Sequence, residues 1–135
     1  MPALCDDGDP CTRDECVDNT CRHPARTGIA SVTCSYEARG LQVPLCAGET
    51  IPASLLKKLT GGRQQAGRAA ATTDLRKAKR AVKKSDAILR GLQSAIRRLR
   101  AHHMSPTCAD QLAAAVDSAR AQAERWLSAP SLTGN

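Results

Sequence analysis

Apolar and small residues recur at alternating steps of three and four through the second half of the chain. This spacing is typical of the buried stripe of an amphipathic helix, and its members are Leu75, Ala78, Val82, Ser85, Leu89, Leu92, Ile96 and Leu99. Thr73 and Asp74 supply an N-cap, and several arginines just before His102 suit the negative end of the helix dipole. The pattern predicts a helix from about 74 to 103.

A second helix is predicted immediately after it. Ser105 and Pro106 form a typical helix start, and Pro130 ends the pattern. The same three-four spacing runs through Cys108, Leu112, Val116, Ala119, Ala123 and Leu127.

A weaker helix is predicted upstream, over about 53–71, where Pro52 opens the pattern. The pair Gly61-Gly62 costs this helix about 1 kcal/mol per glycine, yet the small residues continue the stripe. Three helices joined by short turns predict a mainly α fold with an up-down-up bundle over residues 51–130. The last residues, 131–135, are predicted to be a disordered tail.

The first 27 residues show no hydrophobic periodicity, so crosslinks must order them. The spacing of the four cysteines lacks the paired C-x2-C units of common zinc sites and favours two disulfides. Three pairings are possible. The interleaved pairing Cys5–Cys16 with Cys11–Cys21 is preferred, because each bond then closes a loop of about ten residues.

Residues 28–50 are predicted to be an extended linker that can form a short hairpin around 32–36 and 41–45. An up-down-up bundle places Cys46 and Cys108 at the same end, which predicts a Cys46–Cys108 disulfide. Cys34 is then left unpaired in the predicted scheme, and Cys34–Cys46 is the rival bond.

The stretch CDDGDPCTRDECVDNTCRHP, residues 5–24, resembles one copy of the Cys-rich repeat of Dictyostelium-type extracellular proteins and of myxobacterial surface proteins. The resemblance implies secretion, disulfide bonding and a spacer or adhesive role without catalysis. Those proteins carry the repeat in tandem, so a single copy suggests the carboxy-terminal part of a larger secreted protein. Residues 34–54 and 105–109 resemble, more loosely, the helical tails that follow such repeats in bacterial surface proteins.

Charge divides the chain into two halves, with a net charge of −4 over residues 1–50 and +11 over residues 51–135. Asp7, Asp9 and Asp14 lie on the crosslinked loop and are candidate calcium ligands, since calcium takes several hard oxygens. The alternative is that these aspartates cap turns and keep the module soluble. His23 is predicted to be a surface residue.

Cations crowd the long helix, and they make it a candidate site for an anionic extracellular polymer or for other surface proteins. The residues singled out are Arg76, Lys79, Arg80, Lys83 and Arg90. No aromatic residue lies among them, which disfavours recognition of nucleic-acid bases. The alternative is a solvated face that keeps the bundle soluble.

No nucleophile has an identifiable base and no acidic pair lies in an apolar setting, so no catalytic residue and no enzyme activity are predicted. The chain has no apolar run long enough to span a membrane, and its first residues lack the pattern of a signal peptide. The preferred interpretation is a non-enzymatic extracellular or cell-surface module without a cofactor, calcium excepted. The alternative is a small basic nucleic-acid-binding protein with reduced or metal-bound cysteines.

Overall fold

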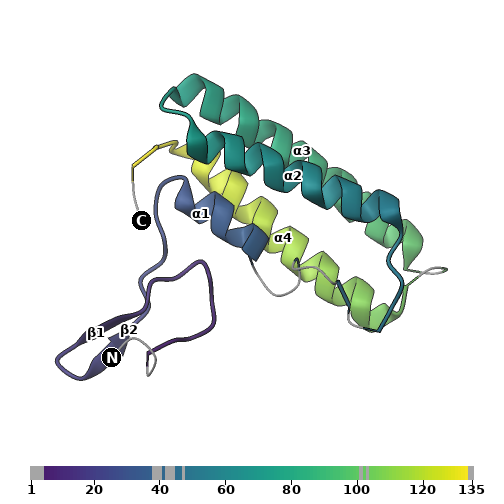
Figure 1. Ribbon diagram of the computed structural model, residues 1–135, viewed down its shortest axis with the longest axis horizontal. Helices are drawn as coiled ribbons and strands as arrows, with labels where there is room; N and C mark the ends of the chain where they lie inside the picture. Colours follow the sequence, from purple (N-terminus) through teal and green to yellow (C-terminus); the bar gives the residue numbers. More distant parts are fainter. Residues whose placement is uncertain are drawn as a thin grey trace.

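The computed structural model of the chain describes residues 5–37, 41, 45–46, 48–100, 102 and 104–133. The chain is mainly helical, with one small antiparallel hairpin near its start (Figure 1). Its elements are β1 Glu15–Val17, β2 Thr20–Arg22, α1 Ala30–Thr33, the 3-10 helix η2 Cys34–Glu37, α2 Ala53–Ala71, α3 Leu75–Leu99 and α4 Pro106–Ser128.

The helices α2, α3 and α4 form the predicted up-down-up bundle (Figure 1). Asp74 caps α3 by accepting a hydrogen bond from the Arg76 amide at 2.9 Å, and Ser105 caps α4 by accepting one from the Cys108 amide at 3.1 Å. The core is built from leucine, valine, isoleucine and many alanines, with Trp126 buried near the end of α4. None of the described helices is long and apolar enough to cross a membrane.

Residues 30–37 are helical, so the predicted hairpin strand at 32–36 is wrong. Val32 and Tyr36 are four residues apart, which places both on one face of a helix, and both are buried. Their segment packs against α2 and α4 and adds bulk to a core that is poor in aromatic residues. Most of 41–45, the other predicted strand, lies outside the described residues, although Leu41 and Leu45 belong to the core.

Tyr36 attaches the helical segment over residues 30–37, here called the connecting segment, to the interface between α2 and α3. The Ser85 hydroxyl donates to the Gly62 carbonyl at 3.1 Å, and the Tyr36 hydroxyl bonds to the Ser85 oxygen. Arg63 adds hydrogen bonds to the carbonyls of Tyr36 and Leu41, at 3.1 and 3.0 Å. The connecting segment is therefore part of the folded core.

The end of the chain folds back onto the bundle as far as residue 133, which corrects the predicted disordered tail. The indole nitrogen of Trp126 donates to the Ser131 carbonyl at 2.9 Å, and Leu132 packs against the core. A buried indole needs an acceptor for its N–H, and the turn after α4 provides one. Residues 134–135 lie outside the described residues.

Candidate functional site

The amino-terminal module contains a hairpin in which strand pairing extends beyond the two short strands β1 and β2. Asp18 and Asn19 form the turn with φ values of 50° and 61°, the backbone of a type I′ hairpin turn. Cys16 lies opposite Cys21 in the ladder. The bridge Thr12–Ala25 and the backbone hydrogen bonds Arg13 N to Pro24 O and Arg26 N to Cys11 O, at 2.9 and 2.8 Å, continue the same register. Residues 11–26 therefore pair as one ribbon.

One face of this ribbon, here called the hairpin face, carries the residues of interest. Side chains alternate between faces along a strand, and directly opposed residues share a face. The loop over residues 5–10 is fastened to this face at two points, the disulfide Cys5–Cys21 and a 2.8 Å hydrogen bond from the Thr12 hydroxyl to Asp7. The hairpin face consists of Thr12, Asp14, Cys16, Cys21, His23 and Ala25.

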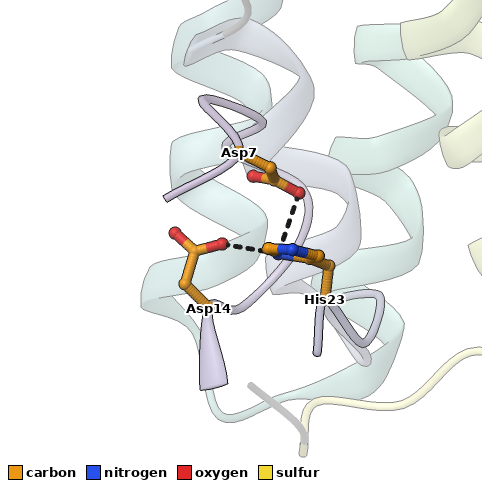
Figure 2. Close-up of side chains that lie close together, drawn as sticks. All are labelled: Asp7, Asp14 and His23. Carbon is orange, nitrogen blue, oxygen red and sulfur yellow. Dashed lines mark hydrogen bonds and ion pairs between the residues drawn. The ribbon is translucent and has the colours of Figure 1, made fainter. Parts of the chain in front are cut away.

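Asp7, Asp14 and His23 converge on this face (Figure 2). The Nδ1 atom of His23 lies 3.0 Å from Asp14 Oδ1 and 3.3 Å from Asp7 Oδ2. The three potential ligand atoms lie within 4.8 Å of one another. The backbone hydrogen bond from Asp9 and then the hydroxyl of Thr12 hold the pKa of Asp7 below its ordinary value of 3.8.

The expected calcium set of Asp7, Asp9 and Asp14 is not brought together. Asp9 instead accepts a hydrogen bond from the Cys11 amide at 2.8 Å and so caps a turn. His23 takes its place, and an imidazole nitrogen suits zinc or other transition metals better than calcium. Because ionised carboxylates only accept, the Nδ1 of His23 carries a hydrogen here, and the three side chains act as an anchor for the loop.

The disulfides are Cys5–Cys21, Cys11–Cys34 and Cys46–Cys108, with Cys16 free and exposed. The predicted bonds Cys5–Cys16 and Cys11–Cys21 are wrong, as is the unpaired Cys34. Cys11 and Cys21 lie on opposite faces of the hairpin, because Cys11 is one residue out of step with Thr12, Asp14 and Cys16. Cys11 therefore bonds to the buried Cys34 and links the hairpin to the helical part.

The bond between Cys46 and Cys108 is as predicted from the bundle topology, with 62 residues of sequence separation. A loop of this length corresponds to about 4 kcal/mol of stabilisation in the chain-entropy account. Beside it, Glu49 accepts hydrogen bonds from the amide and the hydroxyl of Ser105, at 3.0 and 2.7 Å. These bonds, the one from the amide first, hold the pKa of Glu49 below its ordinary 4.5.

A second feature lies between α2 and α3, near the turn that joins them at the upper left of Figure 1. It is an open groove of about 320 Å³ whose lining includes four cations and no acidic residue; we call it the basic groove. None of the four forms an ion pair with another described residue. The cations are Arg68 from α2 and Lys77, Arg80 and Lys84 from α3.

The predicted polyanion-binding residues lie along one side of α3, and only Arg80 also lines the groove. Lys79 is half-buried, whereas Arg76 and Lys83 are exposed. Arg90 lies 3.7 Å from the buried carboxylate of Asp86. The predicted side and the groove are therefore neighbouring surfaces of α3 that share Arg80.

Sequence reasoning missed Arg68 and left Lys77 and Lys84, two cations of the long helix, out of the predicted binding residues. Lys77 and Lys84 are seven residues apart, so they lie on one side of α3. The short turn between α2 and α3 also implies that Arg68 lies opposite the first turns of α3. The shortness of that turn was the sequence signal that could have placed Arg68 beside the cations of α3.

Comparison with protein-family models, with curated proteins and with solved structures gives no match to this chain. The function therefore has to be inferred from the basic groove and the hairpin face themselves.

Proposed function

We propose that this chain is a non-enzymatic extracellular or cell-surface module whose helical bundle binds an anionic polymer in the basic groove. The observation that carries the proposal is the set of four cations in one groove without an acidic partner. The negative charges of the polymer would pair with these four cations, because no acidic side chain lines the groove.

The groove concentrates positive charge where the fold does not favour it. Lys77 and Arg80 lie three residues apart and Arg80 and Lys84 four apart, so each pair repels by a few tenths of a kcal/mol. Lys77 also lies in the first turn of α3, at the positive end of the helix dipole. A bound anion would offset both effects, and this favours a role in binding over a solvated face.

The shape of the groove favours a polymer over a small molecule. Lys77 and Lys84 are separated by seven residues of helix, about 10.5 Å along its axis, which exceeds the size of a single sulfate, phosphate or carboxylate group. The groove is open and has no aromatic residue among its lining. Successive charges on a flexible anionic chain match such a row, and binding of this kind depends steeply on salt.

The extracellular assignment rests on the cysteines. Six of the seven are paired in three disulfides, and such bonds persist in oxidising compartments. The paired cysteines disfavour the alternative of a nucleic-acid-binding protein with reduced or metal-bound thiols. The resemblance of residues 5–24 to repeats of extracellular proteins supports a module at the carboxy-terminal part of a larger secreted protein.

Heparin-affinity chromatography tests the proposal with two matched triple variants of α3. The groove variant carries Lys77→Gln, Arg80→Gln and Lys84→Gln. The control variant carries Arg76→Gln, Lys79→Gln and Lys83→Gln, which removes the same charge from the other side of the same helix.

We expect the groove variant to elute at much lower salt than the control. Its plot of log affinity against log salt should be shallower by about 2 to 3, because each cation lost releases one counterion fewer. Equal losses in the two variants would show that only net charge matters and would refute the groove as the site.

A further inference from the structure

Cys16 lies next to a disulfide that it does not belong to. It is exposed and free, and the hairpin register places it directly opposite Cys21, which is bonded to Cys5. Directly opposed residues point to the same face of a hairpin. Three cysteines therefore meet on the hairpin face.

The register also fixes how close Cys16 and Cys21 are. In antiparallel pairs, hydrogen-bonded and non-hydrogen-bonded pairs alternate. The bonds between Arg13 and Pro24 and between Arg26 and Cys11 identify their pairs as hydrogen-bonded. Every second pair is hydrogen-bonded, so the next hydrogen-bonded pair after Arg13 and Pro24 is Glu15 with Arg22. Cys16 and Cys21 are the pair after that, so they form a non-hydrogen-bonded pair.

Pairs of this kind are the closest in a sheet. Their Cα atoms lie about 4.5 Å apart, which is within the range of about 4.4 to 6.8 Å that a disulfide requires. A bond between Cys16 and Cys21 therefore needs no movement of the ladder.

We propose that Cys16 is an internal nucleophile for the Cys5–Cys21 disulfide. The Cys16 thiolate attacks the Cys21 sulfur, the Cys16–Cys21 bond forms, and the bond to Cys5 breaks. Cys5 leaves as a thiolate and takes up the proton that Cys16 lost. One disulfide and one thiol are present before and after, so the step needs no oxidant and no reductant.

The geometry confines the exchange to one disulfide. Cys11 lies on the opposite face of the hairpin, and its bond to Cys34 is thus screened from Cys16 by the ribbon itself. The Cys46–Cys108 bond joins the connection to the start of α4, within the helical part.

Exchange would change how the loop over residues 5–10 is held. In the structure the loop has a covalent attachment through Cys5 and polar contacts through Asp7 to Thr12 and His23. After exchange only the polar contacts remain, and the hairpin gains a bond across its two strands. Cys5, now 3% exposed, becomes the free thiol.

The test follows the free thiol in the full chain. Protein made in an oxidising compartment is held at mildly acidic pH, then incubated at mildly alkaline pH under inert gas without added thiol or oxidant. Free thiols are trapped with a maleimide after acidification and located by mass spectrometry. We expect the label on Cys16 at the start, and a growing share on Cys5 together with a Cys16–Cys21 crosslinked peptide.

Two variants serve as controls. Cys16→Ser should keep the Cys5–Cys21 bond and take no label at any time. Combining Cys16→Ser with Val17→Cys moves the thiol to the other face of the hairpin, where Val17 is 37% exposed; its label should stay on position 17. The share of label on Cys5 in the native chain should not depend on protein concentration, because the step occurs within one molecule.

Label that stays on Cys16 alone throughout the incubation overturns the proposal. So does label that spreads to Cys11 and Cys34, since the register would then confer no selectivity. An exchange rate that rises with protein concentration overturns it as well, because the attack would come from a second chain.

Discussion

A methyl group on Gly62 would lie 2.7 Å from the hydroxyl oxygen of Tyr36. The phenol ring of the connecting segment thus rests directly on the backbone of α2, and no side chain can stand between them. This contact explains a glycine in the middle of a helix, where glycine is otherwise unfavourable.

Glycine-to-alanine changes along the helices should therefore differ in sign. Gly62→Ala should destabilise the fold by about 1 to 3 kcal/mol, because the methyl group displaces Tyr36 in a packed interior. Gly67→Ala, where nothing lies within 4 Å of the added carbon, should stabilise it by about 0.5 to 1 kcal/mol. Denaturant unfolding measures both, and a stabilising Gly62→Ala would contradict the contact.

Alkaline pH should loosen the attachment of the connecting segment. Burial is the main cause that raises the pKa of Tyr36 from 10.0 to about 12. A raised folded-state pKa means that the contribution is complete below pH 10 and is lost as pH rises towards 12, for a total of about 2 to 3 kcal/mol. Tyr36 is the only tyrosine, so phenolate absorbance reports its titration directly.

The control for this pH dependence is Tyr36→Phe, whose unfolding free energy should lack the fall that begins near pH 10. Lysines titrate in the same range in both proteins, so only the difference between the two curves is informative. Phenolate absorbance that rises in the native chain at the pH of a free tyrosine would contradict the buried position.

Asp86 should be the most sensitive charged position of the bundle. It is 7% exposed, and its carboxylate accepts a hydrogen bond from Arg120 of α4 at 3.1 Å. Arg120→Ala removes the hydrogen bond to this buried carboxylate, leaves it only the more distant Arg90, and should cost about 3 kcal/mol. Arg90→Ala removes a more exposed partner at 3.7 Å and should cost less than about 0.5 kcal/mol. Thermal unfolding of the two variants decides, and equal effects would contradict the role of Arg120.

Acid should release the loop over residues 5–10 from the hairpin face. The pKa of Asp7 is lowered by hydrogen bonds to its charged form, first from the Asp9 amide. Its contribution is therefore complete above the ordinary value of 3.8 and is lost as pH falls through the lower folded-state pKa. The NMR shift of the Asp9 amide should follow this titration in the native chain and not in Asp7→Asn. An amide shift that is the same in both would exclude the bond.

The bundle could be predicted from the sequence because its information is local. The stripe from Leu75 to Leu99 and the Ser105-Pro106 start specify helices without reference to the rest of the chain. The Cys46–Cys108 bond followed from topology alone. The segment with Val32 and Tyr36 was ambiguous, because residues four apart share a face in a helix and in a strand, and only packing against α2 and α4 decides.

The hairpin cysteines could not be paired from loop lengths. The pairing depends on the register of the two strands, and the register is set by the two-residue turn at Asp18 and Asn19. Once that turn is placed, Asp14 falls opposite His23, and Cys11 falls on the far face. The basic groove could not be predicted for a related reason. It is formed by cations of both α2 and α3, whereas the sequence analysis considered the cations of the long helix alone.

The Cys46–Cys108 bond also determines which parts of the chain carry mechanical tension. If the molecule is pulled between its two ends, force passes from Cys46 directly to Cys108 through the disulfide. The helices α2 and α3 lie within the loop that this bond closes, so they carry none of the tension. The α4 helix and the segment between Cys34 and Cys46 bear the load instead. Under such tension the molecule would yield first at those places, while the backbone of the basic groove, whose lining lies between Cys46 and Cys108, stays unstretched.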